Sequence, residues 1–175
     1  MSYKDKLDNC LVSLDVGEKS ALFIVLAADG TICRRGNGNP DKELPLLKGQ
    51  SSLKHYQAFM MTIHEEHFQF SGFFEQTPIV GRPCKLMVVF TGPDGEEAGF
   101  KVNYGEDSLG PPREIVEMLI NAVKITDPWY DQEIARLSEI PHQAAPEVRP
   151  YQTPAVKPLF SKDAPSKGGW WEFWK

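Results

Sequence analysis

The stretch that decides the fold is Ala21-Leu22-Phe23-Ile24-Val25-Leu26-Ala27, which is followed by Ala28-Asp29-Gly30 and then by Thr31-Ile32-Cys33-Arg34-Arg35. Its first part is a continuous apolar run rich in β-forming residues, which is typical of a strand buried on both faces. An Asp-Gly pair between two such runs indicates a hairpin, because glycine adopts positive φ at little cost. The stretch therefore predicts an antiparallel pair of strands.

A second strongly apolar strand is predicted at 84–91, and it too is followed by an Asp-Gly turn and a returning strand, at 99–104. Weaker strand patterns occur at 11–16 and 68–74. The two hairpins resemble each other, which suggests the hypothesis of a duplicated unit of three strands and a helix. The alternative is that strong hairpins look alike without any duplication.

Two main helices are predicted from apolar residues at three- and four-residue spacing. The first covers about 53–63, and the second follows the two prolines at 111–112, which suit a first turn. The predicted buried stripe of the second helix consists of Ile115, Val116, Leu119, Ile120 and Val123. The sequence at 126–128, Thr-Asp-Pro, resembles a new helix start and predicts a separate short helix that ends at about Leu137.

These elements predict an α+β fold: an antiparallel sheet of about six strands with two main helices, followed by an extended Pro-rich C-terminal tail. Prolines recur from Pro141 onward and disfavour both helix and central strand. We therefore expect a globular domain over 1–137, a flexible, Pro-rich linker of extended conformation over 138–169, and an aromatic motif over 170–175. Residues 1–137 carry a net charge of −6 and the remainder +1.

Composition limits the class of protein. The 175 residues are 41% hydrophobic and 25% charged, which fits a water-soluble globular protein. A net charge of −5 disfavours general nucleic-acid binding, which needs a basic surface. The N-terminus lacks the apolar core of a signal peptide, and the longest apolar run, 21–28, is too short to span a bilayer. Three widely spaced cysteines without a CxxC pair suit a reducing compartment, so we expect a cytoplasmic protein without a cofactor. The oligomeric state stays open.

His64-Glu65-Glu66-His67 is the candidate metal site, with His64 and His67 as ligands and His55 on the same predicted helix. A helical zinc site of the H-E-x-x-H type places its histidines four residues apart, whereas here they are three apart. The alternative interpretation is a solvated corner between helix and strand. If the cluster is functional, the protein is a small metal-dependent or acid–base hydrolase.

Arg34 and Arg35 form a weaker candidate for anion binding, because the loop that follows them, Gly36-Asn37-Gly38-Asn39, offers backbone N–H groups. It matches neither a phosphate-binding loop with Gly-Lys-Ser/Thr nor a dinucleotide-binding fingerprint. The alternative is an exposed strand end with an ordinary turn. No nucleophile motif is present, and we predict no catalytic residue.

The sharpest signal is the C-terminal sequence Gly168-Gly169-Trp170-Trp171-Glu172-Phe173-Trp174-Lys175. Four aromatic side chains so close together are costly to leave in water, because each buries about 150–250 Å² when it docks. Three hypotheses follow. The aromatic residues dock in a groove of a partner protein, they lie in a membrane surface beside anionic headgroups, or they pack on the protein itself.

The sequence therefore favours a non-enzymatic cytoplasmic binding or adaptor protein. Its partner-binding residues would be Trp170, Trp171, Phe173 and Trp174, which dock on a partner protein. The alternatives are the hydrolase built on the histidine cluster and a peripheral membrane protein anchored by the Trp-rich tail.

Overall fold

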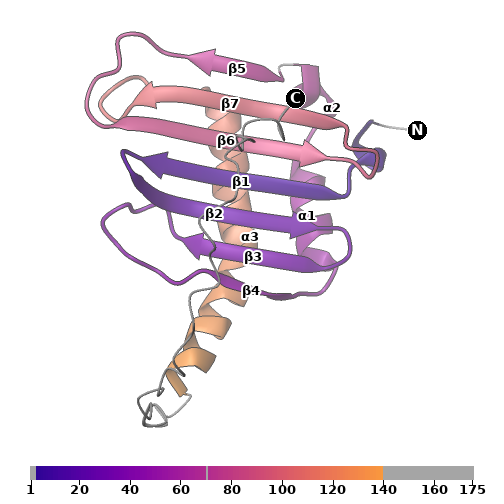
Figure 1. Cartoon of the computed structure of the whole chain (residues 1–175). Coiled ribbons are helices and arrows are strands. Elements are labelled where there is room, and N and C mark those ends of the chain that lie inside the picture. The colour runs from indigo at the N-terminus through magenta and orange to yellow at the C-terminus, as the bar shows by residue number, and fades with distance from the viewer. Residues whose placement is uncertain (1–2, 70, 140–175) are drawn as a thin grey trace, which may run out of the picture. The chain divides into compact units, whose positions relative to one another are not determined.

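The computed structural model describes residues 3–69 and 71–139, and its described elements are seven strands, three α-helices and a short 3₁₀ helix (Figure 1). In chain order, they are the 3₁₀ helix Tyr3–Lys6, β1 Asn9–Val16, β2 Lys19–Ala27, β3 Thr31–Gly36, β4 Leu47–Gln50, α1 Lys54–Thr62, α2 Glu65–Gln69, β5 Gly72–Glu75, β6 Pro83–Thr91, β7 Glu97–Gly105 and α3 Arg113–Glu139.

The strands form one mixed sheet in the order β4-β3-β2-β1-β6-β7-β5. The predicted α+β class and both predicted hairpins, β2–β3 and β6–β7, are confirmed. The prediction of a purely antiparallel sheet of about six strands is wrong in two respects, because β4 adds a strand and β5 pairs with β7 in parallel. The chain reverses between β5 and β6, over 76–82, and again between β6 and β7, over 92–96, so β5 and β7 run in the same direction.

The two halves of the chain do not repeat one pattern of pairing. In the first half β1 pairs with β2, its neighbour in sequence, in antiparallel fashion. In the second half β5 skips β6 and pairs with β7 in parallel. The two similar hairpins, β2–β3 and β6–β7, therefore have differently paired neighbouring strands in the sheet.

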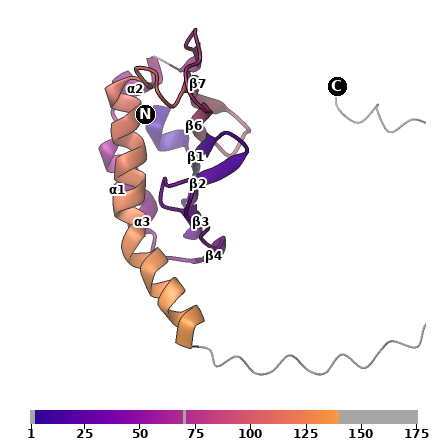
Figure 2. The ribbon, with the colours of Figure 1, turned by 90° about the vertical axis from the view of Figure 1, so that its left-hand side faces the viewer.

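All three α-helices cover the same face of the sheet (Figure 2). The first predicted helix is confirmed as α1, whose buried residues Tyr56, Phe59 and Met60 face the core. Phe59 stacks on Phe90 of β6 with ring centroids 6.3 Å apart. The predicted strand over 68–74 is only partly correct, because α2 precedes a shorter β5.

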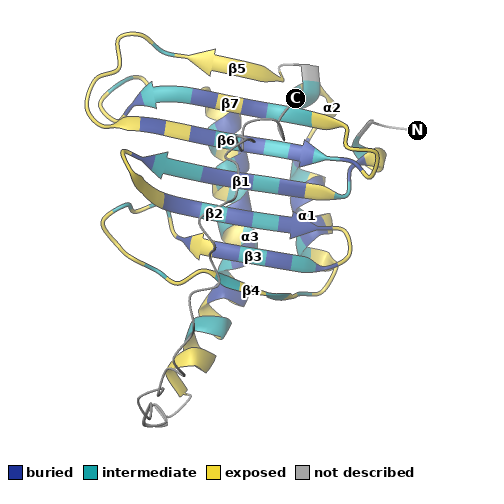
Figure 3. Ribbon diagram, in the orientation of Figure 1, coloured by how far each residue is buried: buried dark blue, intermediate teal, exposed yellow. Residues whose placement is uncertain are grey.

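The opposite face of the sheet carries no described helix (Figures 2 and 3). Along β2, Leu22, Ile24 and Leu26 are fully buried under the helices, whereas Phe23 and Val25, which point the other way, are only half-buried. The expectation that this strand is buried on both faces is therefore wrong. Its apolar residues line two surfaces: a core covered by the helices, and a face that no described helix covers, termed the uncovered face.

Residues 126–128 do not start a separate helix, because α3 runs unbroken through Pro128. Proline removes one backbone hydrogen bond and costs roughly 3 kcal/mol in a helix interior. The next two residues, Trp129 and Tyr130, are buried, and burying two aromatic side chains is worth about that much or more. Tertiary packing therefore keeps the helix continuous, although it changes direction toward its C-terminal end (Figure 2).

The buried stripe of α3 also differs from the predicted one. Ile115 is buried as expected, but Ile120 is 40% exposed. The described stripe consists of Ile115, Met118, Ala122, Thr126, Trp129 and Tyr130. This stripe includes the small Ala122 and the polar Thr126, which hydrophobic periodicity alone does not reveal.

The helix α3 ends at Glu139, two residues beyond the predicted domain boundary at Leu137. The rest of the predicted linker and the whole aromatic motif lie outside the described residues. Within the ranges 3–69 and 71–139, no helix is long and apolar enough to cross a bilayer.

Candidate functional site

Arg34 of β3 joins the sheet to α3 through hydrogen bonds and an ion pair. Strand alternation turns its side chain toward the helices, where it is 1% exposed. Its guanidinium donates to Thr126 Oγ1 at 2.8 Å and to the Val123 carbonyl at 3.1 Å, and it pairs with Asp127 at 2.5 Å. It also lies 4.7 Å from the ring centroid of Tyr130, a cation–π distance. These contacts compensate the buried charge of Arg34. They also use the guanidinium N–H groups that the predicted anion binding would require.

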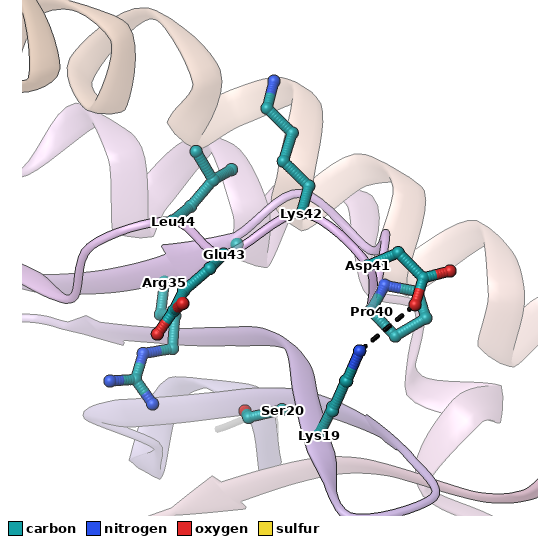
Figure 4. Close-up of a pocket in the computed structure, with 9 residues that line it drawn as sticks. Lys19, Ser20, Arg35, Pro40, Asp41, Lys42, Glu43 and Leu44 are labelled. Carbon is teal, nitrogen blue, oxygen red and sulfur yellow. Dashed lines mark hydrogen bonds and ion pairs between the residues drawn. The ribbon is translucent and has the colours of Figure 1, made fainter.

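Arg35 points to the other side of β3 and is exposed. It lines a pocket of about 350 Å³ between the start of β2 and the loop from β3 to β4 (Figure 4). The pocket mixes charges: Lys19 pairs with Asp41 at 3.2 Å, and Glu43 also lines it. The structure thus separates the two predicted anion-binding arginines. For Arg35, anion binding stays a prediction.

His64 and His67 lie together at the start of α2, with ring centroids 5.3 Å apart. They are linked through the backbone: the His64 N–H donates to His67 Nδ1 at 3.0 Å, and the His67 N–H donates to the His64 carbonyl at 3.0 Å. This reciprocal arrangement caps the helix. His55 lies in the first turn of α1. In the part of the chain that the structure describes, no three or more His, Cys, Asp or Glu side chains form a group that could hold a metal.

The His67 cap predicts a dependence of stability on pH. Burial and the nearby His64 lower the pKa of His67 below its usual 6.5, in keeping with an Nδ1 that accepts a hydrogen bond. The unfolded chain therefore takes up the proton first, so the cap stabilises above pH 6.5 and weakens as the pH falls through that value. The melting temperature of wild type should exceed that of His67→Ala by a few degrees at pH 8, and the difference should shrink by pH 5. A difference of the same size at pH 8 and at pH 5 would rule out the cap.

The three cysteines are free thiols in different surroundings. Cys10 and Cys84 are buried on the helix side, and burial raises the pKa of both thiols, which disfavours the reactive thiolate. Cys33 is half-exposed and faces away from the helices, directly opposite Val25 of β2. Of the three cysteines, Cys33 is therefore the one that lies on the uncovered face of the sheet.

The uncovered face of the sheet is a feature that was not predicted from the sequence. Its centre is apolar and half-buried, and neighbouring strands bring its residues into two adjacent rows. The residues of this uncovered face are Leu11, Phe23, Val25, Cys33, Met87 and Val89. Strand alternation was the available signal, because these residues are every second one along β1, β2, β3 and β6.

Ser13 lies in the middle of the uncovered face, between Phe23 and Met87 in the register of the strands. It is 5% exposed, and its hydroxyl has no hydrogen-bond partner in the described part of the chain. A buried hydroxyl without a partner is unusual, since most such groups are paired. Around this centre, Asp15, Lys85 and Lys101 give the face a polar rim.

Comparison of the chain with models of protein families, with curated proteins and with solved structures found no match. The predicted partner-binding residues Trp170, Trp171, Phe173 and Trp174 lie outside the described residues.

Proposed function

We propose that the protein is a non-enzymatic, cytoplasmic binding or adaptor protein with two recognition elements. The uncovered face of the sheet holds a partner protein, and the aromatic residues Trp170, Trp171, Phe173 and Trp174 dock on that partner. The observation that carries the proposal is the contiguous apolar centre of the uncovered face, to which no described helix contributes.

The composition of this face supports a protein partner. Scattered apolar residues are ordinary on protein surfaces, but contiguous apolar patches mark interaction sites. An apolar centre with a polar rim is the usual anatomy of a protein interface, and here Lys85 and Lys101 lie beside Met87 in the register of β6 and β7. The unpaired hydroxyl of Ser13 offers one further hydrogen bond to whatever covers it.

The aromatic C-terminal residues support the same conclusion from the sequence. Tryptophan is the residue most enriched at energetic centres of interfaces. A second contact on the same partner raises the effective concentration at the first, so two weak contacts give one strong complex. The charge of +1 on residues 138–175 and of −6 on residues 1–137 gives the two elements different electrostatic preferences.

The proposal is tested by crosslinking through Cys33, the half-exposed thiol on the uncovered face. A photoreactive maleimide attached to Cys33 should crosslink one defined partner in cell extract, because only a protein that covers the face comes within reach. The change of Trp170, Trp171, Phe173 and Trp174 to alanine should reduce the crosslinked product at least about tenfold, with an unchanged melting temperature.

Two controls make this result specific. Cys33→Ser should abolish the crosslink, since Cys10 and Cys84 are buried. Phe23→Lys on the uncovered face should prevent it, whereas Ile120→Lys, at a 40% exposed residue of α3, should not. A crosslink that survives the four alanine changes would contradict the role of the aromatic motif, and the absence of any crosslink would contradict the role of the face.

A further inference from the structure

A cavity of about 410 Å³ lies where α2, β5, β7 and the start of α3 meet. Its floor consists of Phe100, Ile115 and Met118, which are 2%, 3% and 2% exposed and belong to the hydrophobic core. Phe74, 39% exposed, adds an aromatic side chain to its lining. A cavity of this size accommodates a small organic molecule. Since the floor offers no charge, the part of a ligand that lies against it must be apolar.

The opening of this cavity is acidic. Glu66 and Glu114 line it, and both are exposed. Among the described residues, neither carboxylate forms an ion pair with lysine or arginine, whereas Glu106, Glu117 and Glu133 each pair with an arginine. Two carboxylates at one opening are therefore left without a cation.

The third polar residue of the cavity does not offset these charges. His67 lies beside Glu66, and its Nδ1 accepts the hydrogen bond from the His64 N–H, which requires an unprotonated Nδ1. Burial lowers the pKa of His67, so the imidazole is neutral near pH 7. Apart from His64, the charged groups that act on His67 are the carboxylates of Glu66, Glu114 and Glu117.

Two helix N-termini offset the charges only in part. Glu66 lies in the first turn of α2 and Glu114 in the first turn of α3, where the helix dipole stabilises a carboxylate. A helix N-terminus is equivalent to at most about half a positive charge. Against two full negative charges, roughly one negative charge remains, and it lies at the edge of an apolar cavity.

We infer that this cavity binds a small organic amine, whose ammonium group lies between Glu66 and Glu114 and whose apolar body lies against Phe100, Ile115 and Met118. The aromatic ring of Phe74 can contact both the ammonium group and the apolar body of the ligand, since aromatic rings attract cations and apolar groups alike. This site is separate from the uncovered face and does not depend on the adaptor function.

The test uses three probes that share a phenylethyl body and differ in their polar group, with the full-length protein at pH 7, titrated by calorimetry and by NMR. The probes are 2-phenylethylamine, which is a cation, 2-phenylethanol, which is neutral, and 3-phenylpropionate, which is an anion. The amine should bind about tenfold more tightly than the alcohol, because two exposed carboxylates each contribute a few-fold. The propionate should bind more weakly than both.

Variants assign the effect to the cavity. Glu66→Gln with Glu114→Gln should remove the preference for the amine and keep the binding of the alcohol. The matched pair Asp94→Asn with Glu96→Gln removes the same charge from the exposed turn between β6 and β7 and should leave the preference intact. Phe74→Ala should weaken amine and alcohol alike. Equal binding of the three probes, no binding at millimolar concentration, or an amine preference that survives the two glutamine changes would overturn the proposal.

Discussion

Arg34→Ala should destabilise the protein by about 3–5 kcal/mol, because it removes a buried guanidinium that joins β3 to α3. The change leaves the Thr126 hydroxyl, the Val123 carbonyl and Asp127 without the partner that they share. The melting temperature should fall by roughly 10–20 °C. Arg34→Lys should recover only part of the loss, because an ammonium cannot reproduce the fixed fork of a guanidinium.

The adjacent Arg35 supplies the control for this prediction. Its side chain is exposed, so Arg35→Ala should change stability by no more than about 0.5 kcal/mol. Thermal unfolding followed by circular dichroism compares the two variants directly. Equal losses in both would mean that Arg34 does not hold the helix to the sheet.

The second large effect is expected at the aromatic centre of the core. Phe90 is fully buried, and its ring lies 6.3 Å from that of Phe59 and 5.3 Å from that of Phe68, measured between centroids. Phe90→Ala should cost about 3–5 kcal/mol, since it removes these contacts and leaves a cavity. Losses of this size approach the whole stability of many domains.

Urea unfolding measures this loss, with Phe73→Ala as the matched variant. Phe73 lies on β5 with 61% of its side chain exposed, so its loss should matter little to stability. The midpoint for Phe90→Ala should fall with an unchanged slope. A midpoint within error of that for Phe73→Ala would place the centre of the core elsewhere.

The elements that could be predicted from sequence are those whose own pattern is strong. β2 and β6 are long apolar segments followed by Asp-Gly, and the structure places them on either side of the central strand β1. β4 has one apolar residue, Leu47, and no periodicity. It is a strand because it pairs with β3 and because Gly49 lies close to the Trp129 ring, where a Cβ atom would come within 3.1 Å. Such contacts between distant segments leave no local pattern.

Two of the candidate sites, unlike β4, did have an informative local pattern. Period-two alternation would have separated Arg34 from Arg35, once the strand at 31–35 was accepted. Similarly, a spacing of three between His64 and His67 fits a helix cap better than a metal site, because a cap joins residues three apart. The amine cavity had no such signal, since its lining comes from four elements between Glu66 and Met118.

The position of β1 in the sheet has a consequence for synthesis. Its partner β6 lies more than sixty residues further along the chain, with Asn9 opposite Thr91 and Val16 opposite Cys84. Since a chain is made from its N-terminus, the β1–β4 meander can form before β6 exists. Until then β1 is an edge whose unpaired backbone groups can recruit another nascent chain. A fragment that stops before β6 should therefore aggregate, and slower synthesis through 51–82 should lower the yield of folded protein.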